Sequence, residues 1–173
     1  RLEELLAGGL DPNETGDEGL TLLHRAAWAG GADAVRLLVA KGADLSPRDP
    51  LGLTAAGRAL AEGRCTAAME LLPKSPGSPS DAERTLLHRA AEGGCAAVAT
   101  ELVTRGAVAD AVDAAGLTPL HLAALSGSGD VAAALLTGGA AGAKAAPSGR
   151  SPLPLAALAG RVEVVKVLLE KGA

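Results

Sequence analysis

The sequence predicts an all-α solenoid, in which helix-turn-helix units with hairpin-like loops stack one on another. Three observations support this fold class. The segment Thr118–Ala124 recurs in weaker copies along the chain, and many of the 23 glycines recur in phase with it. The composition is 48% apolar, with one Trp, no Tyr and no Phe. A core without aromatic rings must be filled by Ala and Leu, and thin helices that approach closely meet that requirement.

The recurring segment reads Thr-Pro-Leu-His-Leu-Ala-Ala in its fullest copy. Copies begin at residues 21, 54, 85, 118 and 151, so the spacings are 33, 31, 33 and 33 residues. Self-similarity at such a period is the signature of a repeat architecture. The most complete early copy predicts a first helix from about Leu22 to Ala29, a break at Gly30-Gly31, and a second helix from about Asp33 to Ala40.

This phase divides one domain, residues 1–173, into consecutive units. Residues 1–13 look like the end of a unit, because Leu2, Leu5 and Leu6 lie at helical spacing before Gly8-Gly9. Three prolines in segment 73–80 can continue neither a helix nor a hairpin, so we expect the stack to bend or weaken there. The expected units are 1–16 (partial), 17–48, 49–80 (irregular, with a Pro/Ser loop at 73–80), 81–112, 113–144 and 145–173.

The last unit carries Pro154 where the other copies favour His. Pro154 falls in the first turn of the expected helix, where a missing N–H costs little. The chain begins at Arg1 and stops at Ala173 without a polar capping repeat. Solenoid ends need such caps for solubility, so we expect the natural protein to continue.

The phased pattern resembles ankyrin repeats over the whole chain, as five repeats and an N-terminal half-repeat. The residues that carry the resemblance are the run at 118–124, the turn glycines Gly30, Gly63, Gly94, Gly127 and Gly160, the leucine pairs Leu37-Leu38, Leu71-Leu72, Leu135-Leu136 and Leu168-Leu169, and the Gly-Ala pairs at 42–43, 106–107, 139–140 and 172–173. The resemblance implies a non-catalytic module that binds other proteins.

Charge and cysteine content narrow the possible partners and location. The net charge is −4 and no basic stripe is visible, which argues against nucleic acid or an anionic membrane as the partner. The apolar runs are short and broken, so no membrane insertion is expected. Cys65 and Cys95 lie near the starts of second helices in adjacent repeats. Neighbouring helices pack about 8–10 Å apart and a disulfide needs Cα atoms within about 7 Å, so we expect reduced thiols and an intracellular protein, cytoplasmic or nuclear.

The three histidines do not indicate a metal site. His24, His88 and His121 lie one or two repeats apart, too far for a shared metal ion, and no acidic or Cys cluster completes a ligand set. We expect each imidazole to hydrogen-bond loop backbone beside the Thr that caps its helix, and the resemblance implies the same architectural role. No nucleophile elbow or phosphate-cradling loop is present. No catalytic residue, cofactor, metal or small-molecule substrate is therefore expected.

The resemblance implies that partners bind the concave side, through loop tips and the exposed face of the first helices. Trp28 is the one aromatic residue, and it is either an interface hot spot or a cover for small neighbours and the leading half-repeat. Asp17, Glu18 and Glu62 are expected to help set the orientation of the partner. The candidate partner-binding residues are Leu20, Trp28, Leu51, Leu53, Arg84, Glu92, Leu117, Leu125, Arg150 and Leu158.

These positions predict binding of a protein or an extended peptide on the concave face, by a monomeric fragment of a scaffold or adaptor protein. Two alternatives remain. The chain could be the repeat region of a larger enzyme, such as a ubiquitin-ligase substrate receptor or a protein with a flanking catalytic domain, or it could be a structural spacer. Ser75-Pro76 and Ser78-Pro79 resemble proline-directed phosphorylation sites, although such dipeptides are common in any Pro/Ser loop.

Overall fold

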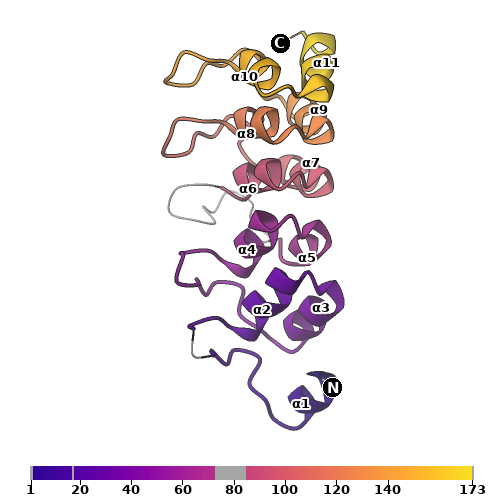
Figure 1. The fold of residues 1–173 in the computed structure, drawn as a ribbon. Coiled ribbons are helices and arrows are strands. Elements are labelled where there is room, and N and C mark those ends of the chain that lie inside the picture. Colours follow the sequence, from indigo (N-terminus) through magenta and orange to yellow (C-terminus); the bar gives the residue numbers. More distant parts are fainter. Residues whose placement is uncertain (1, 17, 73–84, 173) are drawn as a thin grey trace.

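The chain forms a column of short helices in the computed structural model, which describes residues 2–16, 18–72 and 85–172 (Figure 1). Within these residues every regular element is a helix, apart from an isolated bridge between Thr15 and Thr21, so the predicted all-α solenoid is confirmed. Helix α1 (Leu2–Ala7) comes first. Helix pairs follow it: α2 (Leu22–Ala29) with α3 (Ala32–Ala40), α4 (Ala55–Ala61) with α5 (Cys65–Glu70), α6 (Leu86–Glu92) with α7 (Ala96–Thr104), α8 (Pro119–Ser126) with α9 (Gly129–Thr137), and α10 (Pro152–Leu158) with α11 (Val162–Glu170).

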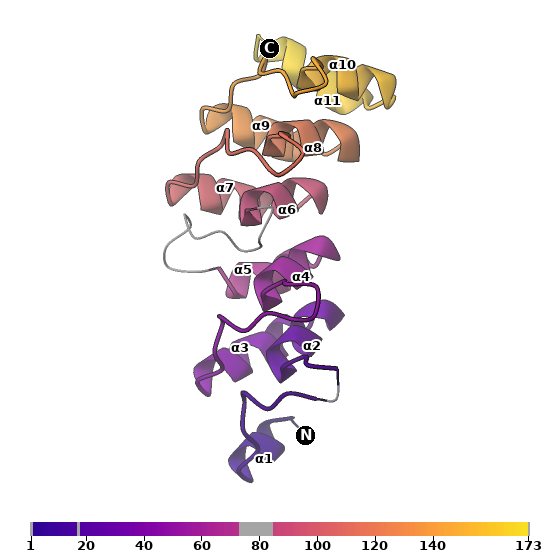
Figure 2. The same cartoon turned by 90° about the vertical axis from the view of Figure 1, so that its left-hand side faces the viewer.

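The helices form two columns. The first helices of the pairs (α2, α4, α6, α8 and α10) stack in one column, and the second helices (α3, α5, α7, α9 and α11) stack beside them (Figure 1). The described loops between one pair and the next project from the column of first helices, toward the viewer in Figure 2. We call the surface made by the loops and first helices the loop-side face, and the opposite surface the second-helix face.

Local sequence explains where the first helices begin and end. Thr21, Thr54 and Thr85 are extended N-caps, and each hydroxyl accepts a hydrogen bond from the amide three residues on, at 3.2–3.4 Å. Helix α2 ends at Gly30, whose φ of 78° lies in the left-handed region that favours glycine. The boundaries predicted for α2 are confirmed, and α3 begins one residue earlier than predicted.

The core consists of Ala and Leu, as the lack of aromatic residues predicted. One leucine in each second helix, or just after it, is buried at the same place in every pair. Alanines such as Ala27, Ala90 and Ala123 are fully buried between neighbouring first helices, which allows the backbones to approach closely. The buried second-helix leucines are Leu38, Leu71, Leu102, Leu135 and Leu168.

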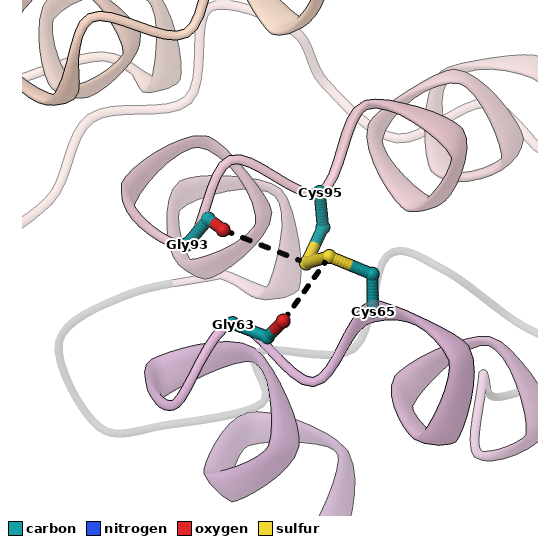
Figure 3. The surroundings of a disulfide bond; sticks show 4 residues. All are labelled: Gly63, Cys65, Gly93 and Cys95. Carbon is teal, nitrogen blue, oxygen red and sulfur yellow. Dashed lines mark hydrogen bonds between the residues drawn. A yellow bond between two sulfur atoms is a disulfide. The ribbon is translucent and has the colours of Figure 1, made fainter. Parts of the chain in front are cut away.

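The expectation of two reduced cysteines is wrong, because Cys65 and Cys95 form a disulfide (Figure 3). Their Cα atoms are 5.2 Å apart. The estimate from helix spacing failed because Cys65 begins α5 and Cys95 caps α7, so both lie at the turns rather than along the helix axes. Gly93 lets these turns approach: a Cβ there would collide with the carbonyl oxygen of Leu60 in the neighbouring pair. The argument for an intracellular location from reduced thiols therefore no longer holds.

The interface between the second and third units, where we expected the stack to weaken, is thus the one that the disulfide links covalently. The Pro/Ser loop at 73–80, with Ser75 and Ser78, lies outside the described residues, as do Asp17 and Arg84. Pro154 is the third residue of α10, within its first turn as predicted.

Candidate partner-binding surface

A histidine joins each of three first helices to the loop of the next pair. The Nε2 of buried His24 lies 3.0 Å from the carbonyl oxygen of Leu53, and its Nδ1 lies 2.8 Å from Oγ1 of Thr21. A carbonyl can only accept, so Nε2 carries the proton and donates, while Nδ1 accepts from the Thr hydroxyl. The expected hydrogen bonds from imidazole to loop backbone are confirmed. The same arrangement joins His88 to the carbonyl of Leu117 at 3.0 Å and His121 to that of Arg150 at 3.2 Å.

The pKa of His121 also agrees with a structural role. Burial lowers the pKa of His121 below its ordinary value of 6.5, against a smaller opposing effect of the bond to the Arg150 carbonyl. A neutral imidazole suits the site, because its one N–H is already directed at a carbonyl. His121 is therefore held as a hydrogen-bond bridge between loops.

Two buried aspartates that the sequence analysis did not single out shape the loops. Oδ1 of Asp49 accepts from the amides of Leu51 and Leu53, at 2.8 and 2.9 Å. Oδ1 of Asp113 makes the same bonds two and four residues on, at 3.0 and 2.9 Å. Each aspartate lies five residues before the capping Thr of its unit, and this shared phase is the signal that could have identified it. These side-chain bonds add to backbone bonds from the Asp49 amide to the Leu53 carbonyl and from the Asp113 amide to the Leu117 carbonyl, and together they turn the loop back toward the helices.

The loop leucines fall into two groups. Leu51 is 70% exposed at a loop tip, so it is available to a partner. Leu20 and Leu53 are only 6% and 5% exposed, so the expectation that they are exposed is wrong. Leu117, in the equivalent place, is half-buried and packs against the core. These three residues directly precede a capping Thr, where the loop has returned to the first helices.

The exposed first-helix candidates form a column near the ends of their helices. Trp28, Leu125 and Leu158 occupy the same place in three units and are 48%, 40% and 72% exposed. Glu92, also exposed, occupies that place between them, and its carboxylate lies 3.4 Å from Nη1 of Arg89. Arg150 is exposed at the base of the last loop. Trp28, Glu92, Leu125 and Leu158 therefore share one place in the repeat, although each belongs to a different helix pair, and Arg84 lies outside the described residues.

Trp28 is held by a residue from the next pair. The guanidinium of Arg58 lies over its ring, 5.7 Å from the centre, which is within the range of a cation–π contact. Arg58 also pairs with Asp49 at 2.6 Å. Trp28 thus packs on Arg58 of the next pair. The place that Arg58 occupies in the repeat is taken by arginine in the first three units and by leucine in the last two. These residues are Arg25, Arg58, Arg89, Leu122 and Leu155.

The second-helix face carries a different hollow. A groove of about 540 Å³ runs between α7 and α9, and its lining includes Ala97, Thr100, Ala133 and Ala134. Its side chains are mostly small, and Asp130 is its one ionisable group among the described residues. In the described part of the chain no three His, Cys, Asp or Glu side chains gather as metal ligands. No helix in that part combines the length and the apolar character needed to cross a lipid bilayer.

Comparison with known families agrees with this architecture. A family model for ankyrin repeats matches residues 1–82, 58–146 and 87–173, which together cover the chain. The chain therefore belongs to the ankyrin repeat family. Ankyrin repeats are generally protein–protein interaction modules and are typically non-catalytic. The comparison with curated proteins found no match.

Proposed function

We propose that the chain binds an extended segment of a partner protein along its loop-side face, as the recognition part of a scaffold or adaptor. The observation that carries this proposal is the column of exposed apolar side chains at one place in three of the first helices, α2, α8 and α10: Trp28, Leu125 and Leu158. Leu125 and Leu158 lie in the neighbouring helices α8 and α10, and contiguous apolar exposure usually marks a binding site. Leu51 adds an apolar loop tip on the same side.

The spacing of the column indicates the size of the ligand. Trp28 and Leu158 are separated by four steps from one pair to the next. Stacked helices lie about 8–10 Å apart, so the column extends over roughly 32–40 Å. An extended chain advances about 3.3 Å per residue, and a segment of about 10–12 residues would cover it.

The composition of the column indicates where the ligand is anchored. Trp28 lies at one end, and Leu125 with Leu158 lies at the other. Ala61 and Glu92 occupy the two places between them. We therefore expect a partner segment with apolar side chains near both ends and a polar middle, bound by a monomer without catalysis.

The test is a capture experiment followed by affinity measurement. The wild-type chain is used to isolate a partner, whose binding segment is then titrated against Trp28→Ala, Leu125→Asp and Leu158→Asp. Each variant is expected to weaken binding at least about tenfold, equivalent to about 1.4 kcal/mol. Circular dichroism checks that the variants remain folded.

Leu169→Asp is the matched control. Leu169 is 61% exposed in α11, in the column of second helices, so this variant is expected to bind like the wild type. If the three loop-side variants retain full affinity, or if Leu169→Asp loses as much as Leu158→Asp, the loop-side face is not the binding surface.

A further inference from the structure

The disulfide between Cys65 and Cys95 is unlike the other contacts between helix pairs because it is covalent. Two arginines occupy, in other units, the place in the repeat that Cys95 occupies in the third. Arg64 donates to the carbonyl of Trp28 at 3.4 Å, and Arg161 donates to that of Leu125 at 3.0 Å. A hydrogen bond back to the preceding pair is thus replaced by a bond that redox chemistry can break and re-form.

The two ends of the disulfide differ in accessibility. Cys95 is 1% exposed within the core, whereas Cys65 is partly exposed. We propose that the disulfide is a site of reversible thiol–disulfide exchange, opened at Cys65 by thiol reductants, that controls how tightly α4–α5 is held to α6–α7. The proposal concerns the stack itself and does not depend on which partner the loop-side face binds.

The reaction with a dithiol reductant proceeds in two balanced steps. A thiolate of the reductant attacks Sγ of Cys65 and forms a mixed disulfide, while the bond to Sγ of Cys95 breaks and Cys95 leaves as a thiolate that takes up a proton. The second thiolate of the reductant then attacks the reductant sulfur that is bonded to Cys65 in the mixed disulfide. Cys65 is released as a thiolate and is protonated in turn. Two electrons pass to the cysteine pair, and the reductant becomes a disulfide.

Cys95, whose sulfur leaves, stands at the end of a helix. It is the N-cap of the nine-residue helix α7, and no side chain caps that end. The amides of the first turn lack intrahelical partners, and the helix dipole places partial positive charge there. Negative charge that develops on Sγ of Cys95 as the disulfide breaks therefore forms at the positive end of the helix dipole.

The reduced state can also be accommodated without unfolding. Sγ of Cys65 lies 3.4 Å from the carbonyl oxygen of Gly63, and Sγ of Cys95 lies 3.8 Å from that of Gly93 (Figure 3). A disulfide sulfur has no proton to donate, but each thiol would have one and a carbonyl acceptor within its own turn. Reduction is therefore expected to loosen this interface while the helix pairs persist.

The first experiment locates the attack. The oxidised, folded chain is incubated with excess glutathione, quenched with an alkylating agent and mapped by mass spectrometry. We expect glutathione on Cys65 and the alkyl group on Cys95, in a ratio of at least about 10:1. Equal labelling, labelling mainly on Cys95, or a disulfide that excess dithiothreitol opens only after urea unfolds the chain would overturn the proposal.

The second experiment measures the consequence for the stack. Reduction is expected to lower the thermal midpoint by about 5–15 °C. It should also speed amide hydrogen exchange in α4–α7 with little change in α9–α11, and reoxidation should reverse both effects. A Cys65→Ser/Cys95→Ser double variant should match the reduced wild type and ignore dithiothreitol. Unchanged exchange on reduction, or unfolding throughout the chain, would contradict the proposal.

Discussion

The guanidinium carbon of Arg58 lies 5.7 Å from the centre of the Trp28 ring. The same guanidinium donates through Nε and Nη2 to Oδ2 of Asp49, at 2.9 and 2.6 Å. Asp49 in turn holds the amides of Leu51 and Leu53. Arg58 therefore links Trp28, the aromatic side chain of the proposed binding face, to the Asp49 carboxylate that shapes the neighbouring loop.

Replacement of Arg58 by Ala should destabilise the chain through Asp49. The Asp49 side chain is fully buried, so its carboxylate would keep its amide donors but lose its charged partner. We expect a loss of about 1–3 kcal/mol in the free energy of unfolding, measured by urea denaturation. Arg36→Ala is the control, because Arg36 is 60% exposed in its ion pairs and should cost less than about 0.5 kcal/mol. Equal effects of the two variants would refute the role given to Arg58.

Leu51 and Leu53 lie two residues apart in one loop, but a charge should destabilise the chain strongly at Leu53 and hardly at all at Leu51. Leu53→Asp would bury a carboxylate in place of a side chain that is 5% exposed, and we expect it to cost more than about 3 kcal/mol. Leu51→Asp changes a side chain that is 70% exposed and should alter stability by less than about 0.5 kcal/mol. Urea midpoints of both variants test this difference, and similar losses would mean that the loop packs in another way.

A methyl group at Gly93 should disrupt the packing of one helix pair against the next. Gly93 has φ −80°, so alanine meets no backbone strain there, but its Cβ would collide with the carbonyl oxygen of Leu60. We expect Gly93→Ala to cost about 1–3 kcal/mol because a backbone must move. Gly31→Ala is the matched control. Gly31 has φ −77° and the nearest atom lies 3.6 Å from the added Cβ, so little loss of stability is expected. Thermal midpoints compare the two, and a tolerated Gly93→Ala would contradict the close approach.

Stability should depend on pH through His121. Burial lowers its folded-state pKa below the 6.5 of the unfolded chain, so the unfolded state binds more protons between the two values. The contribution of His121 is therefore complete above about pH 7.5 and declines as the pH falls through 6.5 toward the folded-state pKa. In His121→Gln the side-chain amide can still donate to the Arg150 carbonyl, but it does not titrate. Urea midpoints between pH 8 and 5 should fall less steeply in this variant than in the wild type, and identical slopes would exclude the effect.

Much of the fold could be predicted from the sequence because it depends on local chemistry repeated in phase. The capping threonines, the turn glycine Gly30 and the buried second-helix leucines act within one unit, and the repeat shows the same device several times. The bond from His24 to loop backbone could be expected on the same grounds. The column of Trp28, Leu125 and Leu158 likewise followed from phase, although its role in binding stays a prediction.

Other properties depend on how one helix pair lies against the next, which the linear pattern does not contain. Leu53 is buried and Leu51 is exposed because Asp49 turns the loop, although both looked alike in the sequence. Arg58 reaches Trp28 from the neighbouring pair. Cys65 and Cys95 are bonded because the turns approach within 5.2 Å at a glycine, where a general helix spacing predicted separation. The sequence by itself therefore determined the repeating unit, and the packing between units decided which side chains are exposed and which are joined.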